Sequence, residues 1–122
     1  MSHLPVLIVD DEPQIRSLVS HILSRQGFQV VEAANGRAAL STLHTLSGAV
    51  GLVISDITMP GLGGAALSRR IKESFPKIPV LLLSANPGPD DLAAGDAFLW
   101  KPFTQSALLR EIGKLMEQPQ CA

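Results

Sequence analysis

Five polar residues stand where short apolar runs of the sequence end, and their types suit phosphoryl chemistry. Asp10 and Asp11 follow the first run, Asp56 the third, Ser84 closes the fourth and Lys101 follows the fifth. Carboxylates that are drawn together at a buried edge repel one another and lose hydration unless a cation neutralises them. Mg2+ is a hard cation that takes oxygen ligands and keeps several waters. The set therefore predicts a Mg2+ site made of carboxylates, with an ammonium group and a hydroxyl beside it.

A carboxylate in such surroundings can accept a phosphoryl group, because a metal ion, a lysine and a hydroxyl each neutralise or hydrogen-bond a phosphoryl oxygen. Asp56 is then the nucleophile, and Lys101 and Ser84 are its helpers. Taken singly, the residues have ordinary explanations: Asp10 or Asp11 can cap a helix, and Asp56 can begin an Asx turn. Their coincidence at the ends of the runs favours a shared chemical role.

The apolar runs are the elements that must position these residues. Short apolar runs bounded by turn residues are typical of strands buried on both faces of a parallel sheet. We expect strands at residues 6–9, 29–33, 50–55, 80–84 and 97–100. Apolar residues with helical spacing lie between them, behind start signals such as Pro13, Asn35 and Thr104.

This alternation predicts an α/β fold: a doubly wound, flavodoxin-like, five-stranded parallel sheet with helices on both faces. In such sheets, functional groups gather at the carboxyl ends of the strands, where all five polar residues stand.

Composition excludes several other classes of protein. The chain has 122 residues, 46% of them hydrophobic, which fits one compact domain and excludes intrinsic disorder. Ten basic residues against eleven acidic ones provide no broad cationic field for direct nucleic-acid binding. The apolar runs are too short to insert in a membrane. A single cysteine, Cys121, and the lack of a visible secretory signal indicate a cytoplasmic protein.

Four stretches resemble, in matching order, the signature of receiver domains of two-component response regulators. They are Val6–Glu12, Asp56–Gly61, Ser84–Ala85 and Phe98–Phe103. The resemblance implies that Asp56 accepts a phosphoryl group from a histidine kinase, a phosphotransfer protein or a small phosphodonor. It also implies that Asp11 and Asp56 bind Mg2+ with the backbone carbonyl of Thr58, while Asp10 supports the ion through water.

The resemblance assigns further roles near the ends of the fourth and fifth runs. Ser84 and Phe98 match the switch pair of the family, in which the hydroxyl follows the phosphoryl group and the aromatic ring turns inward. Lys101 matches the phosphate-binding lysine. The peptide bond between Lys101 and Pro102 is typically cis in the family.

The connection between the fourth and fifth runs departs from the family pattern. Only 16 residues separate Ser84 from Lys101, fewer than the family usually has, and two prolines and a glycine oppose a helix start before Asp90. The fourth helix is expected to be a single turn or missing. We expect Trp100 to share a face with Phe98 and to cover the exposed apolar surface, packed near Leu92. The alternative is a partly exposed edge residue.

We interpret residues 1–122 as a single receiver domain that is not an enzyme and that switches the binding of a downstream protein partner. The short stretch after the last helix predicts no DNA-binding or enzymatic output domain. Two alternatives stay open. One is a phosphohydrolase of the haloacid-dehalogenase kind, which needs an Asp-x-Asp motif where this chain has adjacent Asp10 and Asp11. The other is a degenerate receiver that serves as a constitutive docking scaffold.

Overall fold

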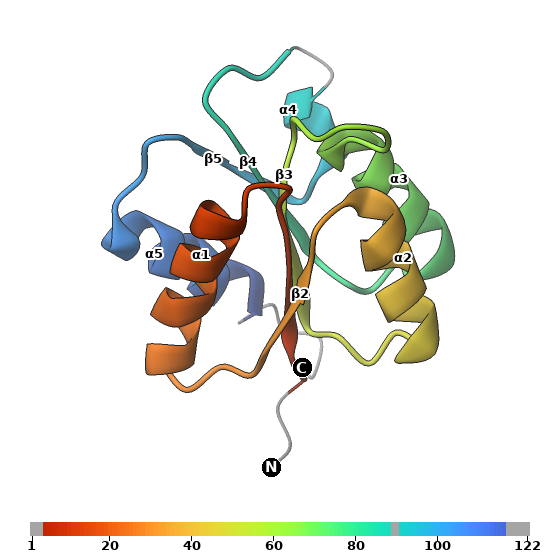
Figure 1. Cartoon of the computed structure of the whole chain (residues 1–122), viewed down its shortest axis with the longest axis horizontal. Coiled ribbons are helices and arrows are strands. Elements are labelled where there is room, and N and C mark those ends of the chain that lie inside the picture. Colours follow the sequence, from red (N-terminus) through yellow and green to blue (C-terminus); the bar gives the residue numbers. More distant parts are fainter. Residues whose placement is uncertain (1–3, 89–90, 117–122) are drawn as a thin grey trace.

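A computed structural model describes residues 4–88 and 91–116 as a five-stranded sheet with helices on both faces (Figure 1). The strands are β1 (Val6–Val9), β2 (Val30–Ala33), β3 (Leu52–Asp56), β4 (Val80–Ser84) and β5 (Ala97–Trp100). The helices are α1 (Pro13–Arg25), α2 (Gly36–Thr45), α3 (Gly64–Ser74), α4 (Asp91–Ala94) and α5 (Gln105–Met116). The strand order is β2-β1-β3-β4-β5, and all neighbouring strands are parallel. The predicted doubly wound α/β fold is confirmed.

Two apolar layers hold the helices against the sheet. The side chains of β1 alternate between them: Leu7 and Val9 pack in the layer under α2 and α3, and Val6 and Ile8 pack in the layer under α1 and α5. All four residues of β1 are buried. Burying one large aliphatic side chain stabilises a fold by roughly 1.5–3 kcal/mol, so these layers fix the position of the strand ends.

Polar side chains cap the N-termini of two helices, α2 and α5, as the sequence predicts. The Oδ1 atom of Asn35 accepts a hydrogen bond from the backbone N–H of Ala38 at 2.8 Å. The Oγ1 atom of Thr104 accepts one from the N–H of Ala107 at 3.0 Å. Each bond satisfies a backbone donor that the first helical turn leaves unpaired.

The fourth helix is a single turn, α4, as expected. Two side chains of α3 hold the segment around it. The hydroxyl of Ser68 donates to the carbonyl of Ala94 at 2.5 Å, and Nζ of Lys72 lies 2.6 Å from Oδ2 of Asp96. The connection from β4 to β5 is therefore fastened to α3 by polar contacts rather than by a full helical face.

The covering role expected of Trp100 is wrong. Trp100 lies on the edge strand β5 and is 57% exposed, while α4 is anchored to α3. The expected shared face is confirmed, because the rings of Phe98 and Trp100 meet edge to face at 5.4 Å. The side chain of Leu92 lies outside the described part of the structure, as does Cys121.

Three strand boundaries differ from the prediction, one of them the end of β3, which includes Asp56 rather than stopping at residue 55. β2 begins at Val30 rather than at residue 29, and β3 begins at Leu52 rather than at residue 50. Val50 is buried, but its N–H donates to the carbonyl of Gly48 in a tight turn, so an apolar residue precedes the strand. None of the helices in residues 4–88 and 91–116 combines the length and apolar character that crossing a bilayer requires.

Candidate functional site

Three carboxylates meet at the carboxyl end of the sheet. β1 and β3 are neighbouring parallel strands, so the residues that end them come to the same edge. Asp10 and Asp11 directly follow β1, and Asp56 is the last residue of β3. Their carboxylate oxygens lie within 4.8 Å of one another. The structure thus brings together the three acidic residues that the sequence singled out.

Burial and mutual repulsion act on this cluster. Asp10 is 2% exposed and Asp56 is 6% exposed, whereas Asp11 is exposed. Burial raises the pKa of Asp10 above its ordinary value, and the charge of Asp56 raises it further. The N–H of Glu12, which donates to Asp10 Oδ1 at 2.9 Å, and the charge of Lys101 oppose this rise.

Lys101 contributes the positive charge predicted beside Asp56. Its Nζ atom lies 3.3 Å from Oδ1 of Asp56. The backbone N–H of Lys101 donates to the carbonyl of Ser84 at 2.9 Å, which ties the end of β5 to the end of β4. The peptide bond between Lys101 and Pro102 is cis, as the resemblance implied.

The hydroxyl and the aromatic ring of the expected switch pair occupy neighbouring strands. Ser84 is 4% exposed at the end of β4, and its Oγ accepts a hydrogen bond from the N–H of Asn86 at 3.1 Å. Phe98 is half-buried on β5 and packs against Trp100. Thr58 is exposed, two residues beyond the end of β3.

Arg16 supports the carboxylate cluster, although it was not singled out from the sequence. Nη1 of Arg16 donates to the carbonyl of Asp10 at 2.6 Å, and Nε of Arg16 lies 3.0 Å from Oε1 of Glu32. Arg16 therefore joins the end of β1 to α1 and to β2. The apolar spacing of a helix identifies the face that packs against the core. It therefore gives no indication of a contact made by a polar residue such as Arg16.

Gly64 is a second residue that supports the cluster. Gly64 is buried and is the first residue of α3. A Cβ atom at this position would collide with the carbonyl oxygen of Asp56 and lie 2.8 Å from Cα of Ile57. Only glycine lets α3 approach the end of β3 this closely.

The carboxylate cluster suits Mg2+ by the chemistry of its donors. Three carboxylates supply the hard oxygen ligands that this ion takes. A divalent cation would also relieve the repulsion that raises the pKa of Asp10. The exposure of Asp11 leaves one side of the cluster open to water, which Mg2+ retains readily.

The fold and this strand-edge cluster together define a doubly wound α/β domain with a carboxylate site at the carboxyl end of its sheet. Residues 6–113 match the family model of the response regulator receiver domain, and the chain belongs to this family. Family membership favours the receiver over the dehalogenase-like alternative. Receiver domains are signalling domains rather than conventional enzymes.

Similar proteins include a transcriptional regulator, a sensor kinase and a response regulator of known structure. The chain is 37% identical over 97% of its length to the transcriptional regulatory protein GlrR of Escherichia coli K12, of which it spans 28%. It is 33% identical over 93% of its length to the sensor kinase CckA of Brucella abortus, of which it spans 12%. Among solved structures, the response regulator TrrA of Thermotoga maritima in complex with Mg(2+)-BeF superposes with a TM-score of 0.83 at 33% identity, covering 93% of this chain and 99% of that one.

Proposed function

We propose that Asp56 is the phosphoacceptor of a two-component phosphorelay and that its phosphorylation switches partner binding. The observation that carries the proposal is the approach of Lys101 Nζ to within 3.3 Å of Asp56 Oδ1, beside two further carboxylates. A lysine held against a buried carboxylate provides the positive charge that an arriving phosphoryl group requires.

The transfer forms one bond and breaks another. A carboxylate oxygen of Asp56 bonds to phosphorus while the bond from phosphorus to the donor breaks, and its electron pair leaves with the donor atom. Lys101 neutralises charge on the phosphoryl oxygens, and the hydroxyl of Ser84 donates a hydrogen bond to one of them. Asp11, Asp56 and the backbone carbonyl of Thr58 would hold Mg2+, with Asp10 supporting it through a water. When bound, the ion supplies further charge neutralisation.

The switch involves the pair Ser84 and Phe98. When Ser84 turns toward the phosphoryl group, Phe98 moves inward and leaves its edge-to-face contact with Trp100. Because α4 is only one turn, Trp100 is exposed beside this movement and reports it to a protein partner.

We infer the wider setting from the relatives. Residues 1–122 form a single receiver domain that takes its phosphoryl group from a histidine kinase or a phosphotransfer protein and acts on a downstream protein. It makes no direct contact with nucleic acid and acts in the cytoplasm. The kinase and the downstream partner are inferred from the similarity to a sensor kinase and to a transcriptional regulator. The lack of nucleic-acid contact is inferred from the near balance of ten basic and eleven acidic residues.

Intact-mass measurement after incubation with a small acyl phosphate and Mg2+ tests the proposal. We expect one phosphoryl addition that decays slowly. It is absent from Asp56→Asn and is lost when a chelator is in excess. No addition to the wild-type protein would instead indicate a degenerate receiver that acts as a docking scaffold. Steady turnover of the donor would indicate a phosphohydrolase.

A further inference from the structure

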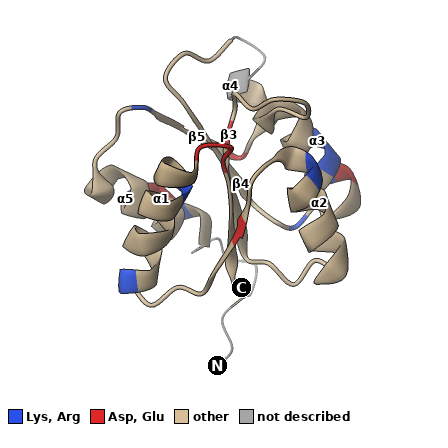
Figure 2. Cartoon of the chain, in the orientation of Figure 1, with Lys and Arg blue, Asp and Glu red and all other residues tan. Residues whose placement is uncertain are grey.

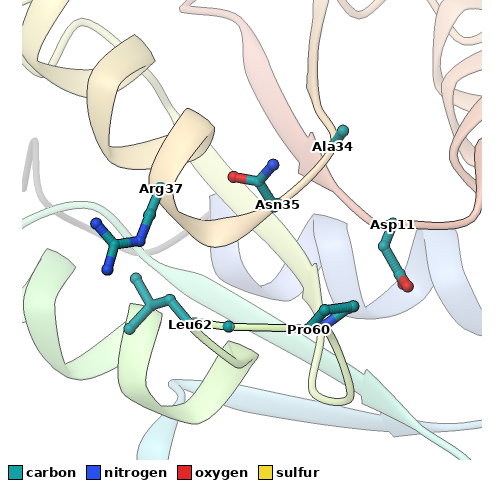
Figure 3. Close-up of a pocket in the computed structure, with 7 residues that line it drawn as sticks. Asp11, Ala34, Asn35, Arg37, Pro60 and Leu62 are labelled. Atoms are coloured by element: carbon teal, nitrogen blue, oxygen red, sulfur yellow. The ribbon is translucent and has the colours of Figure 1, made fainter.

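Two hollows meet on the side of the molecule formed by α2 and α3. The first, of about 410 Å³, extends from Asp11 to Arg37 and Leu62, which lie at its opposite ends in Figure 3. The second, of about 280 Å³, is lined by Arg37, Leu40, Leu62 and Arg70. We call the second hollow the α2–α3 cleft. Because both hollows are lined by Arg37 and Leu62, the cleft adjoins the sheet edge that carries the carboxylates.

The α2–α3 cleft is positively charged without an internal counter-charge. Among the described residues, Arg37 and Arg70 have no carboxylate within ion-pair distance, whereas Arg16, Lys72 and Lys101 each have one. Figure 2 shows basic segments of α2 and α3 next to each other. Arg37 also sits in the first turn of α2, where the helix dipole adds positive potential. Two guanidinium groups on one cleft attract an anion.

The remaining lining residues narrow the chemistry of the ligand. A guanidinium group binds a carboxylate or a phosphate through paired hydrogen bonds. Leu40 and Leu62 line the same cleft and add apolar surface, which a bare inorganic anion would not cover. At the far end of the adjoining hollow, Asp11 repels an extended polyanion such as a nucleic acid. The features together fit carboxylates that flank an apolar side chain.

We propose that the α2–α3 cleft binds an acidic segment of a partner protein, in which carboxylates pair with Arg37 and Arg70 and an apolar side chain contacts Leu40 and Leu62. Uncharged residues of the same segment can continue through the adjoining hollow to the edge at which Asp11 lies. The cleft then guides a partner to the phosphoacceptor edge. Only this guiding role rests on the proposed function of Asp56, because the binding itself depends on α2 and α3.

The test is an amide-resolved NMR titration of the unphosphorylated protein with a synthetic peptide of alternating glutamate and leucine. We expect shifts concentrated at the four lining residues of the cleft. In the double variant Arg37→Gln/Arg70→Gln the dissociation constant rises by about tenfold or more, since two charge-assisted contacts are lost. The matched control is Arg25→Gln/Arg110→Gln, which removes two exposed arginines from α1 and α5 and leaves the affinity within about twofold.

Several results would overturn the proposal. Equal weakening in both double variants would show that net charge alone attracts the peptide. Equal affinity for a glutamine–leucine peptide would remove the role of the carboxylates, and equal affinity for inorganic phosphate would indicate a small-anion site. The titration is repeated with Asp56→Asn, where unchanged affinity is expected. A failure of phosphoryl labelling therefore does not affect this test.

Discussion

The Nζ atom of Lys101 reaches across β4 to lie 3.3 Å from Oδ1 of Asp56 at the end of β3. The side chain of Asp56 is 9% exposed and that of Lys101 is 21% exposed, so water screens this pair less than it screens a surface ion pair. A group that follows the edge strand thus sets the electrostatic environment of a carboxylate on the central strand.

Replacing Lys101 with methionine tests this relationship. In Lys101→Met the buried carboxylate of Asp56 loses its paired cation, so the free energy of unfolding falls by about 1–3 kcal/mol in metal-free buffer. The rate of phosphoryl acceptance from a small acyl phosphate also falls. Urea unfolding and time-resolved mass measurement check the two effects.

The control for this variant is Lys114→Met, whose side chain is 64% exposed and pairs with Glu111 at 3.4 Å. Its effect on unfolding is about 0.5 kcal/mol or less. If Lys101→Met is as stable and as reactive as the wild-type protein, Lys101 has no electrostatic role at Asp56.

The raised pKa of Asp10 predicts how stability depends on pH. Asp10 titrates near 3.8 when unfolded and at a higher pH when folded, chiefly because of burial, so the folded state binds its proton more tightly. The contribution of Asp10 to stability is therefore full below the unfolded value and is lost as pH rises through the folded value. In Asp10→Asn this loss is absent.

Unfolding by urea in metal-free buffer at several pH values measures this difference. We expect Asp10→Asn to gain stability relative to the wild-type protein as pH rises, because the amide does not ionise as the Asp10 carboxyl does. The amide oxygen can still accept the hydrogen bond from the N–H of Glu12. Glu73→Gln, which alters an exposed carboxylate on α3, should show no such relative gain. A relative loss in Asp10→Asn with rising pH would contradict the account.

The close approach of α3 to β3 predicts an unequal effect of two glycine substitutions. A Cβ at Gly64 meets the backbone of Asp56 and Ile57, whereas one at Gly113 in α5 meets no atom within 4 Å. Gly64→Ala is expected to destabilise the protein by about 1–3 kcal/mol and to slow phosphoryl acceptance, because α3 must shift. Gly113→Ala is expected to be neutral or stabilising by up to about 1 kcal/mol. Similar unfolding midpoints for the two variants would contradict this packing argument.

Much of the fold could be predicted because buried parallel strands have a strong local signal. The bounds of β4 and β5 match the prediction, since each is an apolar run that ends at turn residues. The start of β3 was predicted too early because Val50 is an apolar, buried residue of the turn that precedes the strand. Leu18 on α1 fits the apolar spacing yet is 53% exposed, so spacing alone does not define the edge of a helix face.

Some residues of the candidate site could be predicted from the sequence and others could not. Asp56 and Lys101 could be singled out because each stands at the end of a strand, and the topology then brings strand ends together. Arg16, Gly64 and Arg70 could not, because their contacts depend on how helices pack against the sheet. No local pattern in the sequence records that packing.

The contact between Phe98 and Trp100 predicts an optical signal for the switch. Trp100 is the only tryptophan, and its 57% exposure predicts emission typical of a hydrated indole before phosphorylation. Phosphorylation should change the emission as Phe98 leaves the indole. The change should be absent from Phe98→Ala and from Asp56→Asn. An identical response in Phe98→Ala would show that the signal reaches Trp100 by another route.

Chemical location of the phosphoryl group tests the central claim most directly. The protein is treated with a small acyl phosphate and Mg2+. The aspartyl phosphate formed on the protein is then trapped by reduction with borohydride, and the reduced residue is identified by peptide mass spectrometry. The account predicts reduction at Asp56 and at no other carboxylate of the cluster, with none in Asp56→Asn. Modification at Asp10 or Asp11, a stable phosphate on Ser84 or Thr58, or an unmodified Asp56 would contradict it.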